Sequence, residues 1–197
     1  MAEFDLSLAP EITPSPQAWL DHVMTDFDSF LQDHASCEKK ASGMALNVAA
    51  HYPDQPVLLS AMVDLAVEEL NHYREVMRLL MQRGVTPGPD QKDPYIHALN
   101  QHIRRGTENF LLDRLLIGAV VERRGAERFA LIEQGLTDPP LAKFYQSIAA
   151  SEARHWVLFV DLAYQHCARD AVGQRLIELT HAEGEIMAQS PLRAALH

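Results

Sequence analysis

The spacing of apolar residues along the chain is helical almost throughout. Hydrophobic positions recur every three or four residues, as on a helix with one buried face, and no stretch shows the sustained alternation of a β-strand. The pattern predicts four long helices with several shorter ones. Their approximate ranges are 16–22, 25–51, 56–82, 94–103, 107–135, 139–168 and 171–187, after an extended segment over 1–14. The predicted fold class is all-α, with a four-helix bundle at its centre.

Each of the four long helices carries a glutamate halfway along its apolar face. Hydrophobic positions lie one or two turns to either side of each of them. Burying a lone carboxylate costs several kcal/mol unless it is paired or binds a cation. Because four helices repeat this placement, we expect a positive charge among them. The competing interpretation is a bundle with buried Glu–His or Glu–Arg pairs.

A repeated spacing favours a metal. In each half of the chain a histidine follows a glutamate by three residues, so both side chains project from one helix face. Another glutamate precedes each pair by 30 or 31 residues, and the two halves are offset by 83 or 84 residues. Four carboxylates and two imidazoles placed in this way are the ligand set of di-iron and di-manganese bundles. The expected metal ligands, and the expected catalytic centre, are Glu38, Glu69, His72, Glu122, Glu152 and His155.

The donor types narrow the choice of metal. Carboxylate with imidazole, and no thiolate, disfavours a structural zinc site, while imidazole disfavours magnesium and calcium. Iron is therefore expected, with manganese as the second choice. Ligand histidines usually donate their other N–H to a neighbour. Glu68, next to Glu69, is the candidate acceptor, and the same position in the second half is Ser151.

Composition and charge set wider limits. The 197 residues suit one domain, 47% of them are apolar, and no window of eighteen uninterrupted apolar residues predicts a membrane span. The only two cysteines form no CxxC pair, so we expect a reducing cytoplasm. The net charge of −10 argues against a nucleic-acid partner. However, residues 1–33 hold seven acids and no lysine or arginine, and without them and the four ligand glutamates 16 acids face 17 bases.

The segments around the candidate ligands resemble a known family. Residues 34–41, 68–75, 118–129 and 151–156 are similar to those of the ferritin-like tRNA hydroxylases, and more narrowly to the MiaE family of tRNA 2-methylthio-isopentenyl-adenosine hydroxylases. The resemblance extends from about residue 17 to 168. It implies a single ferritin-like di-iron domain over 1–197, built from helix-pair repeats at about 25–82 and 107–168.

The resemblance also implies an activity. A member of this family would be an oxygen-dependent monooxygenase that hydroxylates the isopentenyl group of the modified adenosine beside the tRNA anticodon. It would use two iron ions, dioxygen as co-substrate and electrons from a separate reductase. Glu38 and Glu122 would be terminal ligands, Glu69 and Glu152 bridging ligands, and each iron would have one histidine. The alternative is a ferritin-like or rubrerythrin-like di-iron or di-manganese peroxidase, or a metal-storage protein.

Two further features bear on a tRNA substrate. Small residues such as Gly118 leave room for a substrate or permit close helix packing, and the sequence leaves both open. A basic cluster over 104–128 is a candidate tRNA-contact surface, although a solvated helix face gives the same pattern. We expect no membrane partner, and the oligomeric state stays open between monomer and dimer. The tRNA-contact candidates are Arg104, Arg105, Arg114, Arg123 and Arg124.

Overall fold

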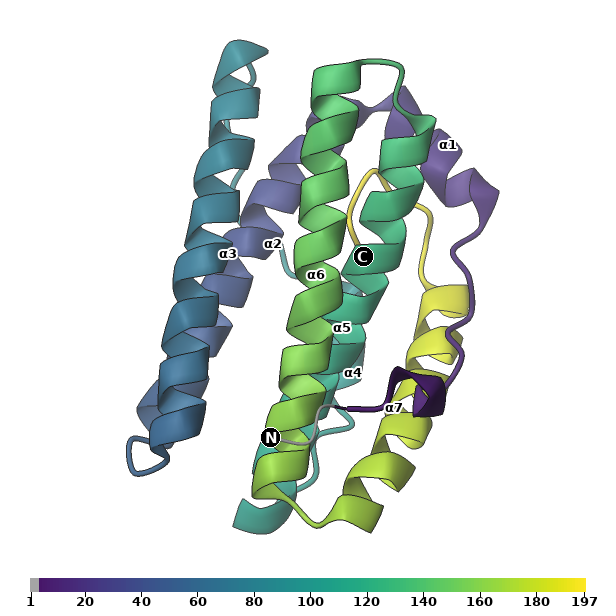
Figure 1. Ribbon diagram of the computed structural model, residues 1–197. Coiled ribbons are helices and arrows are strands. Elements are labelled where there is room, and N and C mark those ends of the chain that lie inside the picture. The colour runs from purple at the N-terminus through teal and green to yellow at the C-terminus, as the bar shows by residue number, and fades with distance from the viewer. Residues whose placement is uncertain (1–3) are drawn as a thin grey trace. The chain divides into compact units, whose positions relative to one another are not determined.

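The computed structural model describes residues 4–197 and, in that range, every side chain except that of Glu108. This part of the chain forms seven α-helices and one 3-10 turn, and it contains no β-strand (Figure 1). The elements are η1 (Leu6–Leu8), α1 (Gln17–Thr25), α2 (Phe27–His51), α3 (Pro56–Gln82), α4 (Pro94–Asn100), α5 (Thr107–Gly135), α6 (Pro139–His166) and α7 (Arg169–Gln189).

The four long helices are those that the sequence predicts, and none of their ends is displaced by more than two residues. The segment expected to be extended contains the η1 turn, and its residues 1–3 lie outside the described part of the chain. The short helix expected over 94–103 already ends at Asn100. Between residues 4 and 197, no helix is both long enough and apolar enough to cross a membrane.

The described chain folds as two compact units, each with its own helix pair. One unit holds α2 and α3 within residues 21–91 and 193–196. The other holds α4 to α7, together with residues 4–20 and 197.

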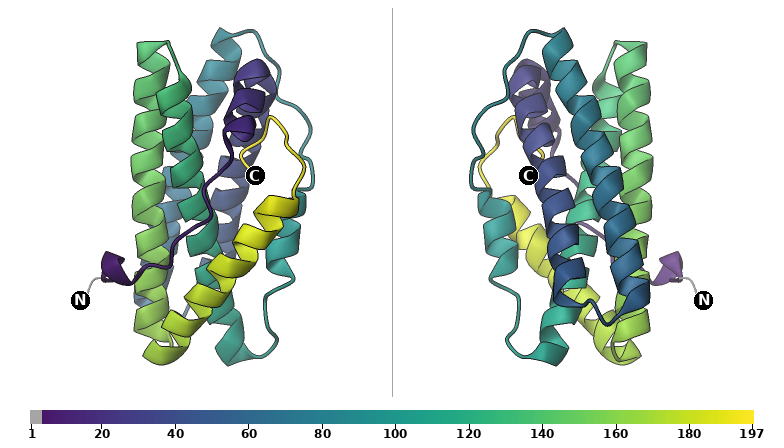
Figure 2. Two further views of the ribbon diagram at one scale, coloured as in Figure 1. Left: turned by 90° about the vertical axis from the view of Figure 1, so that its right-hand side faces the viewer. Right: turned by 90° about the vertical axis from the view of Figure 1, so that its left-hand side faces the viewer.

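α2 and α3 are antiparallel because only four residues connect them (Figure 2). Asp26 caps α2 by accepting a hydrogen bond from the Ser29 N–H at 3.2 Å. Across the pair, the Ser42 hydroxyl donates to the Ala66 carbonyl oxygen at 2.8 Å. α3 ends at Gln82, and Gly84, two residues further on, has a φ of +69° that permits the closing turn. The buried apolar faces include Phe30, Leu31, Ala45 and Val48 of α2 and Leu58, Met62, Leu65 and Val76 of α3.

The second unit is built on α5 and α6, which are joined by three residues. α7 lies obliquely across α5, and α4 contacts both of them (Figure 2). Gly118 of α5 allows a close approach to α6: a Cβ there would lie 2.9 Å from ring carbon Cε1 of Phe159. The sequence left open whether Gly118 makes room for a substrate or permits close helix packing, and the structure shows close packing.

A buried ion pair joins α5 to α7. Arg124 donates from Nε and Nη2 to the two carboxylate oxygens of Glu183 at 2.7 and 2.8 Å, and both residues are 1% exposed. The Tyr95 hydroxyl of α4 donates to the same carboxylate at 3.0 Å. Nη2 of Arg124 also donates to the Thr13 carbonyl oxygen at 2.8 Å, which fixes the N-terminal segment to this unit.

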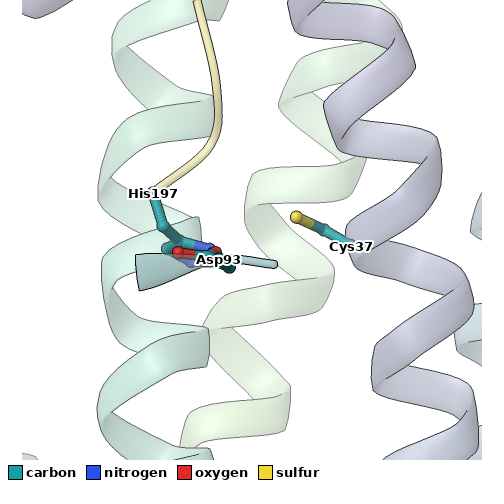
Figure 3. A group of neighbouring side chains, drawn as sticks. All are labelled: Cys37, Asp93 and His197. Carbon is teal, nitrogen blue, oxygen red and sulfur yellow. The ribbon is translucent and has the colours of Figure 1, made fainter. Parts of the chain in front are cut away.

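The last residue of the chain packs on the start of α4. The His197 ring stacks on Tyr95 with 4.7 Å between the ring centroids. Its Nδ1 lies 3.4 Å from Oδ2 of Asp93, and the two side chains are seen side by side in Figure 3. Asp93 is the N-cap of α4 and accepts hydrogen bonds from the backbone N–H groups of Tyr95 and Ile96.

Candidate metal centre

The α2–α3 pair brings three of the candidate ligands together. Glu69 and His72 lie one turn apart on α3, and Glu38 faces them from α2. Nδ1 of His72 is 3.5 Å from Oε2 of Glu38 and 3.5 Å from Oε2 of Glu69. The three residues are 3%, 1% and 8% exposed in chain order. We call them the α2–α3 cluster.

The charges of the α2–α3 cluster are strongly coupled. Burial alone would raise the pKa of the Glu38 carboxyl group, but hydrogen bonds from His34 and His72 hold that pKa well below its usual range. Burial alone would lower the pKa of His72, but the carboxylates of Glu38 and Glu69 raise it to about 10. The two carboxylates thus favour a cation beside them, and a metal ion would take the place of the imidazole proton.

The α5–α6 pair forms a second cluster of the same composition. Glu122 comes from α5, and Glu152 and His155 come from one turn of α6. Nδ1 of His155 lies 3.6 Å from Oε2 of Glu152 and 3.8 Å from Oε2 of Glu122. All three residues of this α5–α6 cluster are buried.

His155 of the α5–α6 cluster has Ser151 as a neighbour. From the sequence alone, Ser151 was named only as the residue at the position equivalent to Glu68. The Ser151 hydroxyl oxygen, itself buried, lies 3.4 Å from Nε2 of His155. It can therefore orient the ring while Nδ1 faces the glutamates. Glu68, at the same position of the other repeat, is half-buried on α3, and its role toward His72 stays a prediction.

Sequence reasoning missed one buried residue beside the α2–α3 cluster. Nε2 of His34 lies 2.6 Å from Oε1 of Glu38, and His34 is fully buried. The signal for it was present, because His34 precedes Glu38 by one helical turn on the same apolar face.

The donor sets fit a metal centre of the di-iron kind. Each cluster offers two carboxylates and one imidazole, which divalent iron and manganese accept, and neither contains a thiolate. One donor atom from each of the three residues in a cluster lies within 4.8 Å of the others. Sites of this size and composition, buried on helix faces, match the ligand pattern of the carboxylate-bridged bundles.

The structure corrects part of the predicted tRNA-contact surface. Arg124 is 1% exposed, and its guanidinium is occupied by Glu183 and Thr13, so no phosphate can reach it. Arg123 is half-buried, donates to the Pro10 carbonyl oxygen, and its guanidinium lies 4.8 Å from the centre of the Trp156 ring. Both arginines thus hold the N-terminal segment against the unit that contains α5 and α6.

The three remaining candidate arginines differ in how accessible their charged groups are to a tRNA phosphate. Arg104 donates from Nε and Nη2 to the buried carboxylate of Asp113 at 2.9 and 2.8 Å. Arg114 is half-buried, and Arg105 is exposed. As a tRNA contact, Arg105 therefore stays the strongest prediction of the five.

The fold is similar to that of a known oxygenase. A solved protein described as "Protein 43 with aldehyde deformylating oxygenase activity from Synechococcus" matches with a TM-score of 0.90 and 32% sequence identity, over 96% of this chain and 95% of that chain. This similarity confirms the predicted fold class, which is all-α and ferritin-like.

Sequence similarity defines the family more narrowly. A Pseudomonas putida protein named tRNA 2-(methylsulfanyl)-N(6)-isopentenyladenosine(37) hydroxylase is 37% identical over 191 residues, which cover 94% of this chain and 92% of that protein. A Salmonella typhimurium protein of the same name is 27% identical over 206 residues, covering 80% and 76%. The family described as "MiaE: tRNA-(MS[2]IO[6]A)-hydroxylase (MiaE)" matches residues 10–197. The chain belongs to the MiaE family, as the sequence motifs predicted.

Proposed function

We propose that this protein is an oxygen-dependent di-iron monooxygenase that hydroxylates the isopentenyl group of 2-methylthio-isopentenyl-adenosine beside the tRNA anticodon. The observation that carries the proposal is the pair of buried clusters, each with two glutamates and one histidine, in a chain of the MiaE family. The names of the two relatives support the choice of substrate. This substrate in turn favours the cytoplasm as the compartment.

In this proposal each cluster holds one divalent iron, and its two carboxylate charges balance the two positive charges of the ion. Each loaded cluster is then neutral, which lowers the cost of burying it. Glu38, Glu69 and His72 would hold one iron, and Glu122, Glu152 and His155 would hold the other.

The proposed reaction inserts one oxygen atom of dioxygen into a C–H bond of the isopentenyl chain. The other oxygen atom leaves as water, with two protons and two electrons, and the electrons come from a separate reductase. Bound iron supplies the activation of dioxygen. The protein's own part is to hold the donors in place and to exclude water. Buried apolar residues one turn or more from the ligands serve this purpose: Leu65, Val76, Ile148 and Phe159.

The proposal is tested with purified protein loaded anaerobically with ferrous iron. Substrate tRNA, a reductant and isotopically labelled dioxygen are added, and the nucleosides are analysed by mass spectrometry. We expect two irons per chain and one labelled oxygen atom in the isopentenyl chain. A protein that binds two irons but only consumes peroxide, with no change in the tRNA, would support the peroxidase alternative instead.

A further inference from the structure

His34 makes the two clusters unequal at one position. It lies one turn before Glu38 on α2, and its Nε2 is 2.6 Å from Oε1 of that glutamate. An ionised carboxylate only accepts hydrogen bonds, so Nε2 of His34 is the donor. The ring is buried beside Phe30, with 5.9 Å between the ring centroids, so it has little freedom to turn away.

The two oxygen atoms of Glu38 therefore have different roles. Oε1 accepts the hydrogen bond from His34, whereas Oε2 lies 3.5 Å from Nδ1 of His72, on the side of the other ligands. We propose that His34 is a positioning residue that occupies Oε1, so that Glu38 offers a metal only Oε2. This inference rests on the proposed di-iron centre.

The second helix pair has no donor at the corresponding position. The offset of 84 residues that relates Glu38 to Glu122 also relates His34 to Gly118, which has no side chain. The space above Gly118 is filled by the Phe159 ring, whose Cε1 lies 2.9 Å from where a Cβ would be. An aromatic ring thus stands where the first pair has an imidazole donor.

The consequence is that the two clusters depend on different neighbours for metal binding: His34 holds Glu38 in the first, whereas Ser151 adjoins His155 in the second. Residues that orient a ligand from outside the coordination sphere typically contribute a factor of about 10–100 to metal affinity. His34 gives this support to the α2–α3 cluster only. We therefore expect loss of the His34 N–H to weaken metal binding at the α2–α3 cluster and to leave the α5–α6 cluster unchanged.

The test is an anaerobic calorimetric titration of the apo-protein with ferrous iron. His34→Phe keeps a buried ring but removes the donor, and it should weaken one of the two binding steps by about 10–100-fold while the other is unchanged. His34→Gln, which can still donate to Oε1, should restore that step to within several-fold of wild type. The matched control is His51→Phe, since His51 is exposed at the end of the same helix; both steps should be unchanged.

The outcomes separate this inference from the proposed function. If wild type does not bind two irons, the proposed di-iron centre is wrong. If wild type binds two and His34→Phe alters neither step, or both equally, the positioning role is wrong. Should His34→Phe fail to fold, a Mössbauer spectrum of the wild-type protein loaded with iron-57 decides: two resolved signals of equal area are expected, and a single signal would overturn the positioning role of His34.

Discussion

Two buried carboxylates beside each histidine repel one another unless a cation lies between them. At Glu122, the glutamate that α5 supplies, this makes metal binding and stability interdependent. We expect Glu122→Ala to lower iron content and to reduce hydroxylation about 100-fold or more. Iron should also raise the melting temperature of wild type more than that of the variant, because binding to the folded state stabilises it and the variant keeps only the α2–α3 cluster intact. Glu133→Ala, a half-buried position near the end of the same helix, is the control.

Gly118 is the residue at which the packing of α5 on α6 is most sensitive to size. Adding a Cβ there meets the buried Phe159 ring at 2.9 Å, so we expect Gly118→Ala to destabilise the protein by about 1–3 kcal/mol. Gly43→Ala on α2 has nothing within 4 Å of its Cβ and should instead stabilise by about 1 kcal/mol through helix propensity. Denaturant unfolding of both variants measures the difference, and equal effects would contradict the close packing.

Single residues were predictable from the sequence where the relevant geometry is local. Glu69 and His72 lie on one turn of one helix, so their spacing alone places them together. The burial of Arg124 could not be predicted in this way, because its partner Glu183 is 59 residues away on another helix. The hydrogen bond from His34 to Glu38 is local in sequence, but which oxygen atom it occupies depends on side-chain rotamers.

Among the contacts between elements, the Arg124–Glu183 pair should matter most to stability. Removing one partner of a buried ion pair leaves the other uncompensated, so Arg124→Leu should cost about 3–5 kcal/mol of unfolding free energy. Arg105→Leu removes an exposed arginine and should change stability by no more than about 0.5 kcal/mol. Urea unfolding of the two variants tests this, and similar values would contradict the structural role of Arg124.

Asp93, at the start of α4, makes a pH-dependent contribution to the free energy of unfolding. Burial opposes ionisation of Asp93, but His197 and two backbone N–H groups lower its pKa from 3.8 to about 2. The unfolded chain therefore takes up a proton first, so the contribution of Asp93 is complete above pH 4 and is lost as the pH falls to 2. Between pH 5 and 2 wild type should lose about 2 kcal/mol more than Asp93→Asn.

The control for Asp93 is Asp138→Asn. Asp138 occupies the N-cap position of α6, but its side chain accepts no cap hydrogen bond. This variant removes a carboxylate from a helix N-terminus without removing a side-chain cap hydrogen bond. A wild-type acid profile that matches that of Asp93→Asn would show that the carboxylate contributes nothing.

The bounds of the long helices could be predicted closely from local sequence signals. Apolar periodicity together with Pro56, Gly84 and Pro139 set the ends of the long helices, because these residues act on the backbone where they stand. The path of the N-terminal segment could not be predicted in this way. It is fixed by contacts with residues more than a hundred positions away, such as the one between Thr13 and Arg124.

The charge of the whole molecule is distributed more unevenly than its net value of −10 suggests. Because three of the five candidate arginines, Arg104, Arg123 and Arg124, have hydrogen-bond partners within the protein, the basic surface is smaller than the sequence implied. We expect Arg105→Glu to weaken tRNA binding and to reduce the slope of log affinity against log salt by about 1. Arg124 is buried, and its loss is expected to destabilise the protein, so it cannot serve as a comparison; Arg169→Glu, exposed at the start of α7, is the control. An unchanged slope for Arg105→Glu would remove it from the tRNA-contact surface.

The most direct measurement is a nucleoside analysis of tRNA from cells that lack the gene and from cells in which it has been restored. We expect 2-methylthio-isopentenyl-adenosine to accumulate without the protein. Its hydroxylated form, heavier by one oxygen atom, should return with the wild-type gene but not with Glu122→Ala. An identical nucleoside profile in all three strains would contradict the proposed function.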